Sequence, residues 1–310
     1  MDHSMGIWQV GGLIVLAVVS VAYALGALRV RYVSPRLTSP WRMAAFGFGI
    51  AALMAALVWP LPGWSNALLS MRSLQKVLIC MVAAPLLWLA CPLHVLAWAG
   101  GPRQRGLYVR LQAATQRPGT WLHTATQPLV LWFVYLAASL FWHDPQAAPF
   151  MLGDGWFHYV APWLLLGAAL LFWWPIVDTG PRRLPRLPLW LLLAYVLGVE
   201  IANMVAGVTI AFSIEPVYPH YVAMRQSLGD ATLPLSLLTD QILGGALVWV
   251  LGSLVYIAAI ILILHRLFRL DGATAPQPPA NWDAHAKFIA PGLEERAAYN
   301  ELHNVDLSHR

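Results

Sequence analysis

Two histidines at the ends of neighbouring apolar segments are the residues best suited to chemistry in this sequence. His143 ends a segment that reads SLFWHDP, and His158 begins the next one, which reads WFHYVAP. The stretch between them contains Met151 and no Lys or Arg. Imidazole and thioether groups together suit copper, so the pattern suggests a metal site. The alternative interpretation is that both histidines are interfacial anchors beside Trp142 and Trp156.

The start of the chain, MDHSM, offers a second candidate for copper. A free amino terminus followed by a histidine in third place, here His3, can bind copper(II) in a square plane. This geometry requires that Met1 is retained and that it carries no formyl group. A third-place histidine also arises by chance, and His3 then has no role in metal binding.

Four further polar residues fall within apolar segments. Glu200 and Asn203 lie near the middle of one segment, and Asp240 and Gln241 lie near the start of the last one. A bare charge in hydrocarbon costs at least about 2.5–3.5 kcal/mol, so each carboxylate needs a proton or a partner. An intramembrane Glu200 is therefore a functional candidate. The alternative is a neutral side chain bonded to Asn203 or to a backbone carbonyl.

Arg72 and Lys76 stand four residues apart in the stretch MRSLQK, at the start of another apolar segment. Residues at this spacing share one face of a helix, where two cations repel each other. An acidic side chain should therefore face them. We predict an ionic clamp between Asp240 and either Arg72 or Lys76, with Gln241 beside it as part of the clamp or of a partner-docking surface. In the alternative interpretation, both cations extend their charged ends to water and lipid phosphates.

The elements that must position these residues are membrane-spanning helices. The chain has 310 residues, of which 59% are hydrophobic and 11% are charged, whereas about a quarter are charged in soluble domains. About 20 apolar residues are needed to cross a bilayer as a helix. We assign seven segments to such spans, approximately 7–28, 43–62, 74–98, 128–143, 156–177, 188–214 and 236–267. The sequence thus predicts an all-α integral membrane protein, a bundle of seven transmembrane helices.

Basic residues predict the side of the membrane on which each loop lies, because Lys and Arg near span ends stay cytoplasmic. All but three of the 19 Lys and Arg residues fall on one side of this topology, and the three exceptions are Arg72, Lys76 and Arg225. The N-terminus is then outside and the C-terminus cytoplasmic, in a bacterial inner membrane. The net charge of +5 reflects this topology, and we expect no nucleic-acid partner.

The chain divides into a predicted membrane domain, residues 1–269, and a predicted flexible cytoplasmic tail, residues 270–310. The tail contains the stretch PQPPANW and scattered charges, which is typical of an unstructured arm. The alternative is that this arm docks onto a partner.

From about Met43 to Arg269 the sequence resembles the CtaG-like family of cytochrome c oxidase assembly factors. The elements that carry the resemblance occur in the family's order: PLPGWSNALLSMRSLQKVLICMVAAPLL, CPLHVLAW, SLFWHDP, LLFWWPIV, AFSIEPVYPHY and DQILGGALVWVLGSLVY. The resemblance implies a seven-span membrane protein that helps to mature the copper centres of a haem-copper oxidase. It also implies that histidines near the outer surface are the metal ligands and that oxidase subunits are partners.

One departure from the family concerns those ligands. The family typically reads HMxQH at the start of the third span, whereas this sequence has Arg72 and Lys76 on either side of the retained Gln75. An arginine has no lone pair to offer a metal, and an interfacial lysine stays an ammonium unless it is strongly desolvated. His143 and His158 remain, but Pro162 stands one turn after His158, where the family has a further histidine. Half of the expected ligand set is therefore missing.

Three functions from different classes are compatible with these features. The first is a non-catalytic assembly factor that handles copper through His143, His158 and either Met151 or His3. The second is a metal-free accessory subunit that is stably bound to a respiratory or other membrane complex. The third is a transporter that uses Glu200 and Asn203, although few other polar residues lie inside the spans. We expect no haem, because the adjacent outer ends of two helices leave little depth for a porphyrin.

Overall fold

The computed structural model describes residues 6–100, 102–117, 119–153, 155–177, 187–228 and 233–273. Every regular element in these ranges is helical, which confirms the all-α prediction. His3 and residues 274–310, which form most of the predicted tail, lie outside the described residues. Contacts divide the chain into two units, Met1–Arg266 and Leu267–Arg310.

Six helices among the described residues are long and apolar enough to cross a membrane. They are α1 (Ile7–Val30), α2 (Pro40–Leu57), Leu69–Leu89, α11 (Phe157–Val177), α12 (Leu189–Phe212) and Leu237–Phe268. Shorter elements lie between them, namely η1 (Pro35–Thr38), α3 (Leu61–Ser65), α6 (Pro92–Ala99), α7 (Pro102–Gln116), α8 (Trp121–Ala125), α10 (Ala148–Leu152) and α13 (Pro219–Leu228).

The remaining predicted span corresponds to α9 (Pro128–His143), an apolar helix of 16 residues. At a rise of 1.5 Å per residue this helix is about 24 Å long, whereas the hydrocarbon core of a bilayer is about 30 Å thick. By length and composition the described residues thus contain six spans. The seventh span stays a prediction.

Two of the long helices contain a π-helical segment. Leu69–Leu89 consists of α4 (Leu69–Val77), η2 (Leu78–Ala83) and α5 (Ala84–Leu89), and the last helix consists of α14 (Leu237–Ala246), η4 (Leu247–Leu251) and α15 (Gly252–Ala273). In each π-helical segment, a carbonyl accepts a hydrogen bond from a neighbouring helix. Trp173 Nε1 donates to the Cys80 carbonyl at 2.7 Å, and Asn203 Nδ2 donates to the Val248 carbonyl at 2.9 Å.

The third span differs from the predicted stretch 74–98. The helix begins at Leu69 and ends at Leu89, because Cys91 has a positive φ of 51° and Pro92 then begins α6. A left-handed residue does not continue a right-handed helix, and the residue before a proline disfavours the helical region. Arg72 and Lys76 therefore lie inside the helix, whereas the sequence placed them at its edge.

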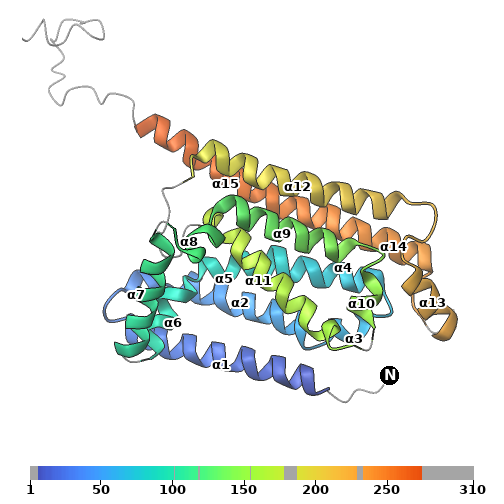
Figure 1. Ribbon diagram of the computed structural model, residues 1–310, viewed down its shortest axis with the longest axis horizontal. Helices are drawn as coiled ribbons and strands as arrows, with labels where there is room; N and C mark the ends of the chain where they lie inside the picture. Colours follow the sequence, from blue (N-terminus) through green and yellow to red (C-terminus); the bar gives the residue numbers. More distant parts are fainter. Residues whose placement is uncertain are drawn as a thin grey trace, which may run out of the picture. The chain divides into compact units, whose positions relative to one another are not determined.

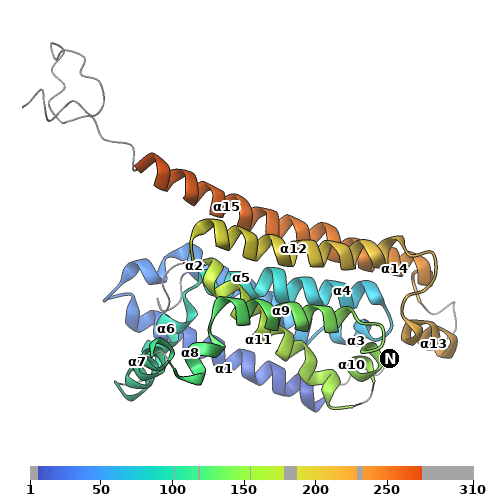
Figure 2. The same ribbon diagram turned by 45° about the horizontal axis from the view of Figure 1, so that its top comes forward.

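The helix Leu69–Leu89 is the most buried of the six and forms the centre of the bundle. It contacts α2, α11 and α14. In Figures 1 and 2, α4 and α5 lie between α1 and α2 on one side and α12 and α15 on the other. Side chains of the central helix are thus enclosed by neighbours, and a polar group on it must find its partners within the protein.

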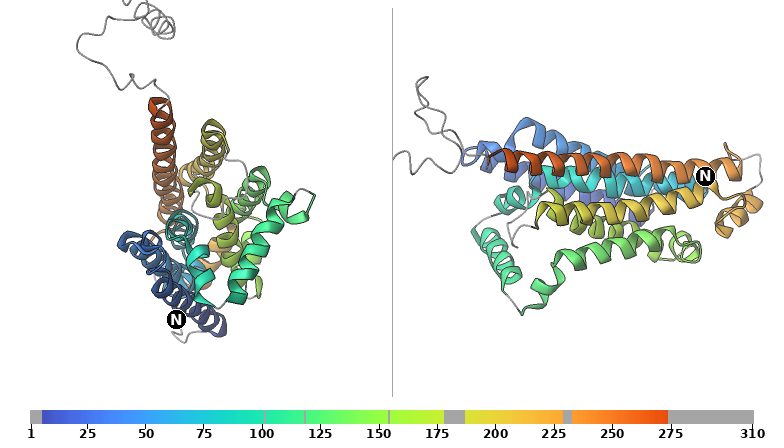
Figure 3. Two further views of the ribbon diagram at one scale, coloured as in Figure 1. Left: turned by 90° about the vertical axis from the view of Figure 1, so that its left-hand side faces the viewer. Right: turned by 90° about the horizontal axis from the view of Figure 1, so that it is seen from above.

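The two ends of the bundle carry different elements. The start of α1 lies with α3, α10 and α13 at one end, which we call the α10 end, and α6, α7 and α8 lie at the other, the α7 end (Figure 1). Seen from above, the long helices run side by side between these ends (Figure 3). The α10 end therefore collects His143, Met151 and His158, as the antiparallel connectivity predicts. Which side of the membrane this end faces stays a prediction.

Candidate functional site

Lys76, on α4, is fully buried and bridges two other helices. Its Nζ lies 2.6 Å from Nε2 of His143 on α9 and donates to Oδ1 of Asn203 on α12 at 3.2 Å. An ammonium group can only donate hydrogen bonds. With Lys76 charged, His143 therefore accepts at Nε2 and carries its own proton on Nδ1. A single side chain thus connects α4, α9 and α12.

Arg72 lies one turn before Lys76 on the same helix and is 3% exposed. Its Nη2 donates to the carbonyl of Trp142 at 3.1 Å and to Sδ of Met151 at 3.3 Å. The guanidinium carbon also lies 4.3 Å from the centre of the Trp142 ring, which is a cation–π distance. No carboxylate among the described residues pairs with it. Arg72 is therefore a buried cation whose charge is met by a carbonyl dipole, a thioether and an aromatic face.

Asp240 does not pair with either cation, so the predicted ionic clamp was wrong. Its carboxylate accepts hydrogen bonds from the backbone N–H of Leu69 at 2.7 Å, from that of Ser70 at 3.1 Å and from Ser70 Oγ. These N–H groups form the first turn of α4, whose N-cap residue, Leu68, has no capping side chain. Asp240 thus caps α4 from the neighbouring α14, where the helix dipole favours a negative charge.

Gln241 connects α14 to the segment between α12 and α13. Its Oε1 accepts from the backbone N–H of Val217 at 2.8 Å, and its Nε2 donates to the carbonyls of Ser213 at 3.3 Å and Glu215 at 3.2 Å. Asp240 and Gln241 are both buried. In this structure both are structural residues, and neither presents a surface on which a partner could dock.

The three predicted copper ligands gather at the α10 end, but the donor atoms of His143 and Met151 face the two cations of α4. His143 Nε2 faces the Lys76 amine, and Met151 Sδ accepts from the Arg72 guanidinium. His158 Nδ1 lies 2.8 Å from the backbone carbonyl of Met151. Within the described ranges, no three or more His, Cys, Asp or Glu side chains form a group that could hold a metal ion. In this arrangement His143 and Met151 do not offer a lone pair to a copper ion.

The two intramembrane polar residues of α12 do not pair with each other. Asn203 divides its amide between Lys76 and the Val248 carbonyl. Glu200 is 9% exposed, and its Oε2 has no hydrogen-bond partner among the described residues. The interpretation in which Asn203 satisfies Glu200 is therefore wrong.

Two tyrosines before and within α13 bind backbone carbonyls of other elements. Tyr218 donates from its hydroxyl to the His143 carbonyl at 2.8 Å, and Tyr221 donates to the Ser65 carbonyl at 2.8 Å. Burial raises the pKa of Tyr218 to about 12 and also raises that of Tyr221. Both phenols therefore stay protonated at neutral pH and act as donors.

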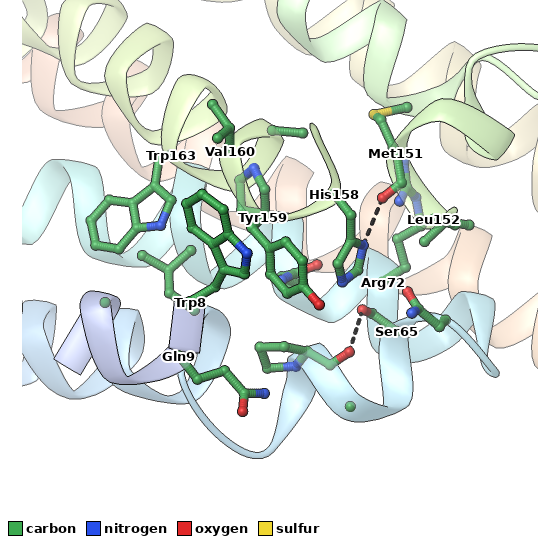
Figure 4. A pocket seen from close by; sticks show the side chains of 18 of the residues that line it. Trp8, Gln9, Ser65, Arg72, Met151, Leu152, His158, Tyr159, Val160 and Trp163 are labelled. Atoms are coloured by element: carbon green, nitrogen blue, oxygen red, sulfur yellow. Dashed lines mark hydrogen bonds between the residues drawn. The ribbon is translucent and has the colours of Figure 1, made fainter. Parts of the chain in front are cut away.

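A cavity of about 470 Å³ lies beside Arg72 at the α10 end. Figure 4 shows Trp8 of α1 and Tyr159 and Trp163 of α11 around it, with Arg72 and His158. The rings of Trp8 and Tyr159 are stacked with their centres 5.4 Å apart. Trp8 was missed as a site residue, because no spacing in the sequence indicates that the first helix lies next to α11.

Residues 21–270 match the family model described as cytochrome c oxidase caa3 assembly factor. No curated protein and no solved structure matches the chain. The matched range includes both cations of α4 and the residues that bind them.

Proposed function

Because the chain belongs to the cytochrome c oxidase caa3 assembly factor family, we propose that it supports the assembly of a haem-copper oxidase as a non-catalytic protein without a bound metal ion. The observation that carries the metal-free part is the 2.6 Å contact between Lys76 Nζ and His143 Nε2. A metal ion needs the lone pair that this ammonium engages, and two buried cations repel a third positive charge.

The same contacts support a non-catalytic role. The two cations of α4 are bound to groups of α9, α10 and α12, so both side chains are held in place within the protein. Such a network holds one arrangement of helices and presents a constant shape to other subunits. We therefore propose that the protein acts on oxidase subunits through contact within the membrane.

We further propose that α9 is a seventh span and that the α10 end faces outward from a bacterial inner membrane. α9 runs alongside α11 and α12 within the bundle, and its apolar side chains Phe133 and Leu140 are exposed, as in a helix that faces lipid. Basic residues such as Arg29, Arg36 and Arg103 lie in elements of the α7 end, which supports a cytoplasmic position for that end.

A second candidate function is maturation of the oxidase copper centres. The observation in its favour is that His143, Met151 and His158 converge at the α10 end. Copper could bind His143 Nε2 and Met151 Sδ only after the Lys76 and Arg72 side chains had moved away from them.

Purification from the native membrane in mild detergent tests both candidates. We expect oxidase subunits to co-purify with the tagged protein while copper stays far below one ion per chain. Stoichiometric copper in the wild-type protein would contradict the metal-free proposal. Failure to recover any oxidase subunit, together with unchanged oxidase content in a deletion strain, would contradict the assembly role.

A further inference from the structure

The cavity beside Arg72 is lined by a buried cation without a carboxylate partner and by an indole N–H without an acceptor among the described residues. The buried guanidinium of Arg72 has no carboxylate partner among the described residues, although it lines the cavity. The indole of Trp142 also lines the cavity, is 3% exposed and has an Nε1–H without a hydrogen-bond partner in the described part of the chain. A buried donor without an acceptor is uncommon in folded proteins. A buried cation without a carboxylate and an indole N–H without an acceptor, beside one cavity, indicate a ligand that carries an oxyanion.

The opposite side of the cavity is apolar and reaches the surface of the bundle. Gly11 and Val15 of α1 line this side and are exposed. Trp163 of α11 also lines it and is partly buried. A Cβ atom added at Gly11 would meet nothing within 4 Å, whereas one added at Gly26 would lie 2.1 Å from the Val95 carbonyl of α6. α1 is thus tightly packed at Gly26, near the α7 end, and has open space beside Gly11, near the α10 end.

We propose that this cavity binds a membrane phospholipid, with its phosphate at Arg72 and Trp142 and an acyl chain along α1 and α11. Phosphate oxygens match the guanidinium and the indole N–H as hydrogen-bond acceptors. Trp8 and Tyr159 stack at the rim of the cavity, and aromatic side chains of this kind lie at the level of lipid head groups. An acyl chain matches the apolar side. This proposal is independent of the assembly role.

The experiment is a lipid titration of the delipidated protein in detergent, followed by native mass spectrometry. The probes are dioleoyl phosphatidylglycerol, dioleoylglycerol, which has the same chains and no phosphate, and inorganic phosphate. Arg72→Gln removes the cation, Trp142→Phe removes the indole N–H but keeps an aromatic ring, and Gly11→Leu fills the apolar side. Gly167→Leu is the matched control, because Gly167 is exposed on α11 outside the cavity and also has nothing within 4 Å of its added Cβ.

We expect phosphatidylglycerol to bind the wild type and dioleoylglycerol to bind at least about tenfold more weakly, because hydrogen bonds to a charged group are lost. Arg72→Gln should weaken phosphatidylglycerol binding by a similar factor. Trp142→Phe and Gly11→Leu should also weaken it, and Gly167→Leu should not. Trp142→Phe and Gly11→Leu both retain Arg72, so they test the site even when Arg72→Gln fails to fold.

Three results would overturn the proposal. Equal binding of phosphatidylglycerol by the wild type, Trp142→Phe and Gly11→Leu would show that the lipid lies elsewhere. Displacement of the lipid by equimolar inorganic phosphate, with unchanged binding in Gly11→Leu, would assign the site to free phosphate. Loss of oxidase co-purification in a folded Arg72→Gln variant, with unchanged lipid binding, would assign Arg72 to a carboxylate of a partner protein.

Discussion

At the scale of single residues, Lys76 determines what His143 can bind. The ammonium lies against Nε2 of the imidazole and also against Oδ1 of Asn203. Both acceptors are thereby satisfied inside a bundle where water is scarce. Removal of the lysine would leave two polar groups without a partner, and such groups are costly when buried.

We predict that Lys76→Met lowers the free energy of unfolding by about 1–3 kcal/mol, because methionine keeps much of the volume but donates no hydrogen bond. The measurement is the apparent Tm of the detergent-solubilised protein. Arg36→Met is the control, since Arg36 is exposed in η1. An equal Tm for wild type and Lys76→Met would contradict the structural role of the lysine.

We predict that the double variant Arg72→His/Lys76→His gains copper binding that the wild type lacks. The substitutions remove both buried cations and place imidazoles beside His143 and Met151, a donor set that suits copper. Copper content after dialysis and the d–d absorption band provide the measurement. Equal copper binding by wild type and double variant would show that Lys76 and Arg72 do not block the site.

At the scale of helices, α4 depends on a cap that another helix provides. Its own N-cap residue is Leu68, which has no side-chain acceptor. Asp240 of α14 supplies the carboxylate and binds the N–H groups of Leu69 and Ser70. The position of α4, and with it the position of both cations, is therefore coupled to the docking of α14.

We predict that Asp240→Ala destabilises the protein by about 1–3 kcal/mol, because the first turn of α4 loses its acceptor in a buried place. The apparent Tm in detergent again gives the measurement. Glu215→Ala is the matched control, since the Glu215 side chain is exposed and only its backbone carbonyl takes part in a hydrogen bond with Gln241. A similar Tm for both variants would contradict the capping role.

At the scale of the whole membrane unit, the proposed topology places α3, α10 and α13 on the outer side and α6 to α8 in the cytoplasm. Both native cysteines of the chain are buried. Single cysteines introduced at exposed positions therefore report the topology by their access to a reagent that does not cross the membrane.

We predict that an impermeant maleimide labels Gly155→Cys in intact cells and labels Arg36→Cys only after the cells are opened. Gly155 lies between α10 and α11, and Arg36 lies in η1 between α1 and α2. Position 120, just before α8, extends the test to α9, since it should be protected like position 36. The reverse pattern would contradict the proposed orientation, and labelling of positions 120 and 155 from the same side would contradict a seventh span.

The family, the helical class and the approximate limits of most long helices could be predicted from the sequence. Apolar runs and the distribution of arginines depend on solvation by lipid and water, which is a property of local composition. The gathering of His143, Met151 and His158 at one end also followed, because consecutive antiparallel helices bring their ends together. The limits of the third helix did not follow from apolar composition, which continues past Leu89. Pro92 was the sequence signal for its end, whereas the left-handed conformation of Cys91 has no compositional signal.

The sequence by itself determined that buried polar groups of the spans must find partners, since charges in hydrocarbon are costly. Only the tertiary structure decided which partners they have. Asp240 binds backbone N–H groups, Lys76 binds an imidazole and an amide, and Arg72 binds a carbonyl, a thioether and an indole ring. The physical reason is that a hydrogen bond depends on distance and direction between helices far apart in the chain, and backbone acceptors and donors have no signature in residue type.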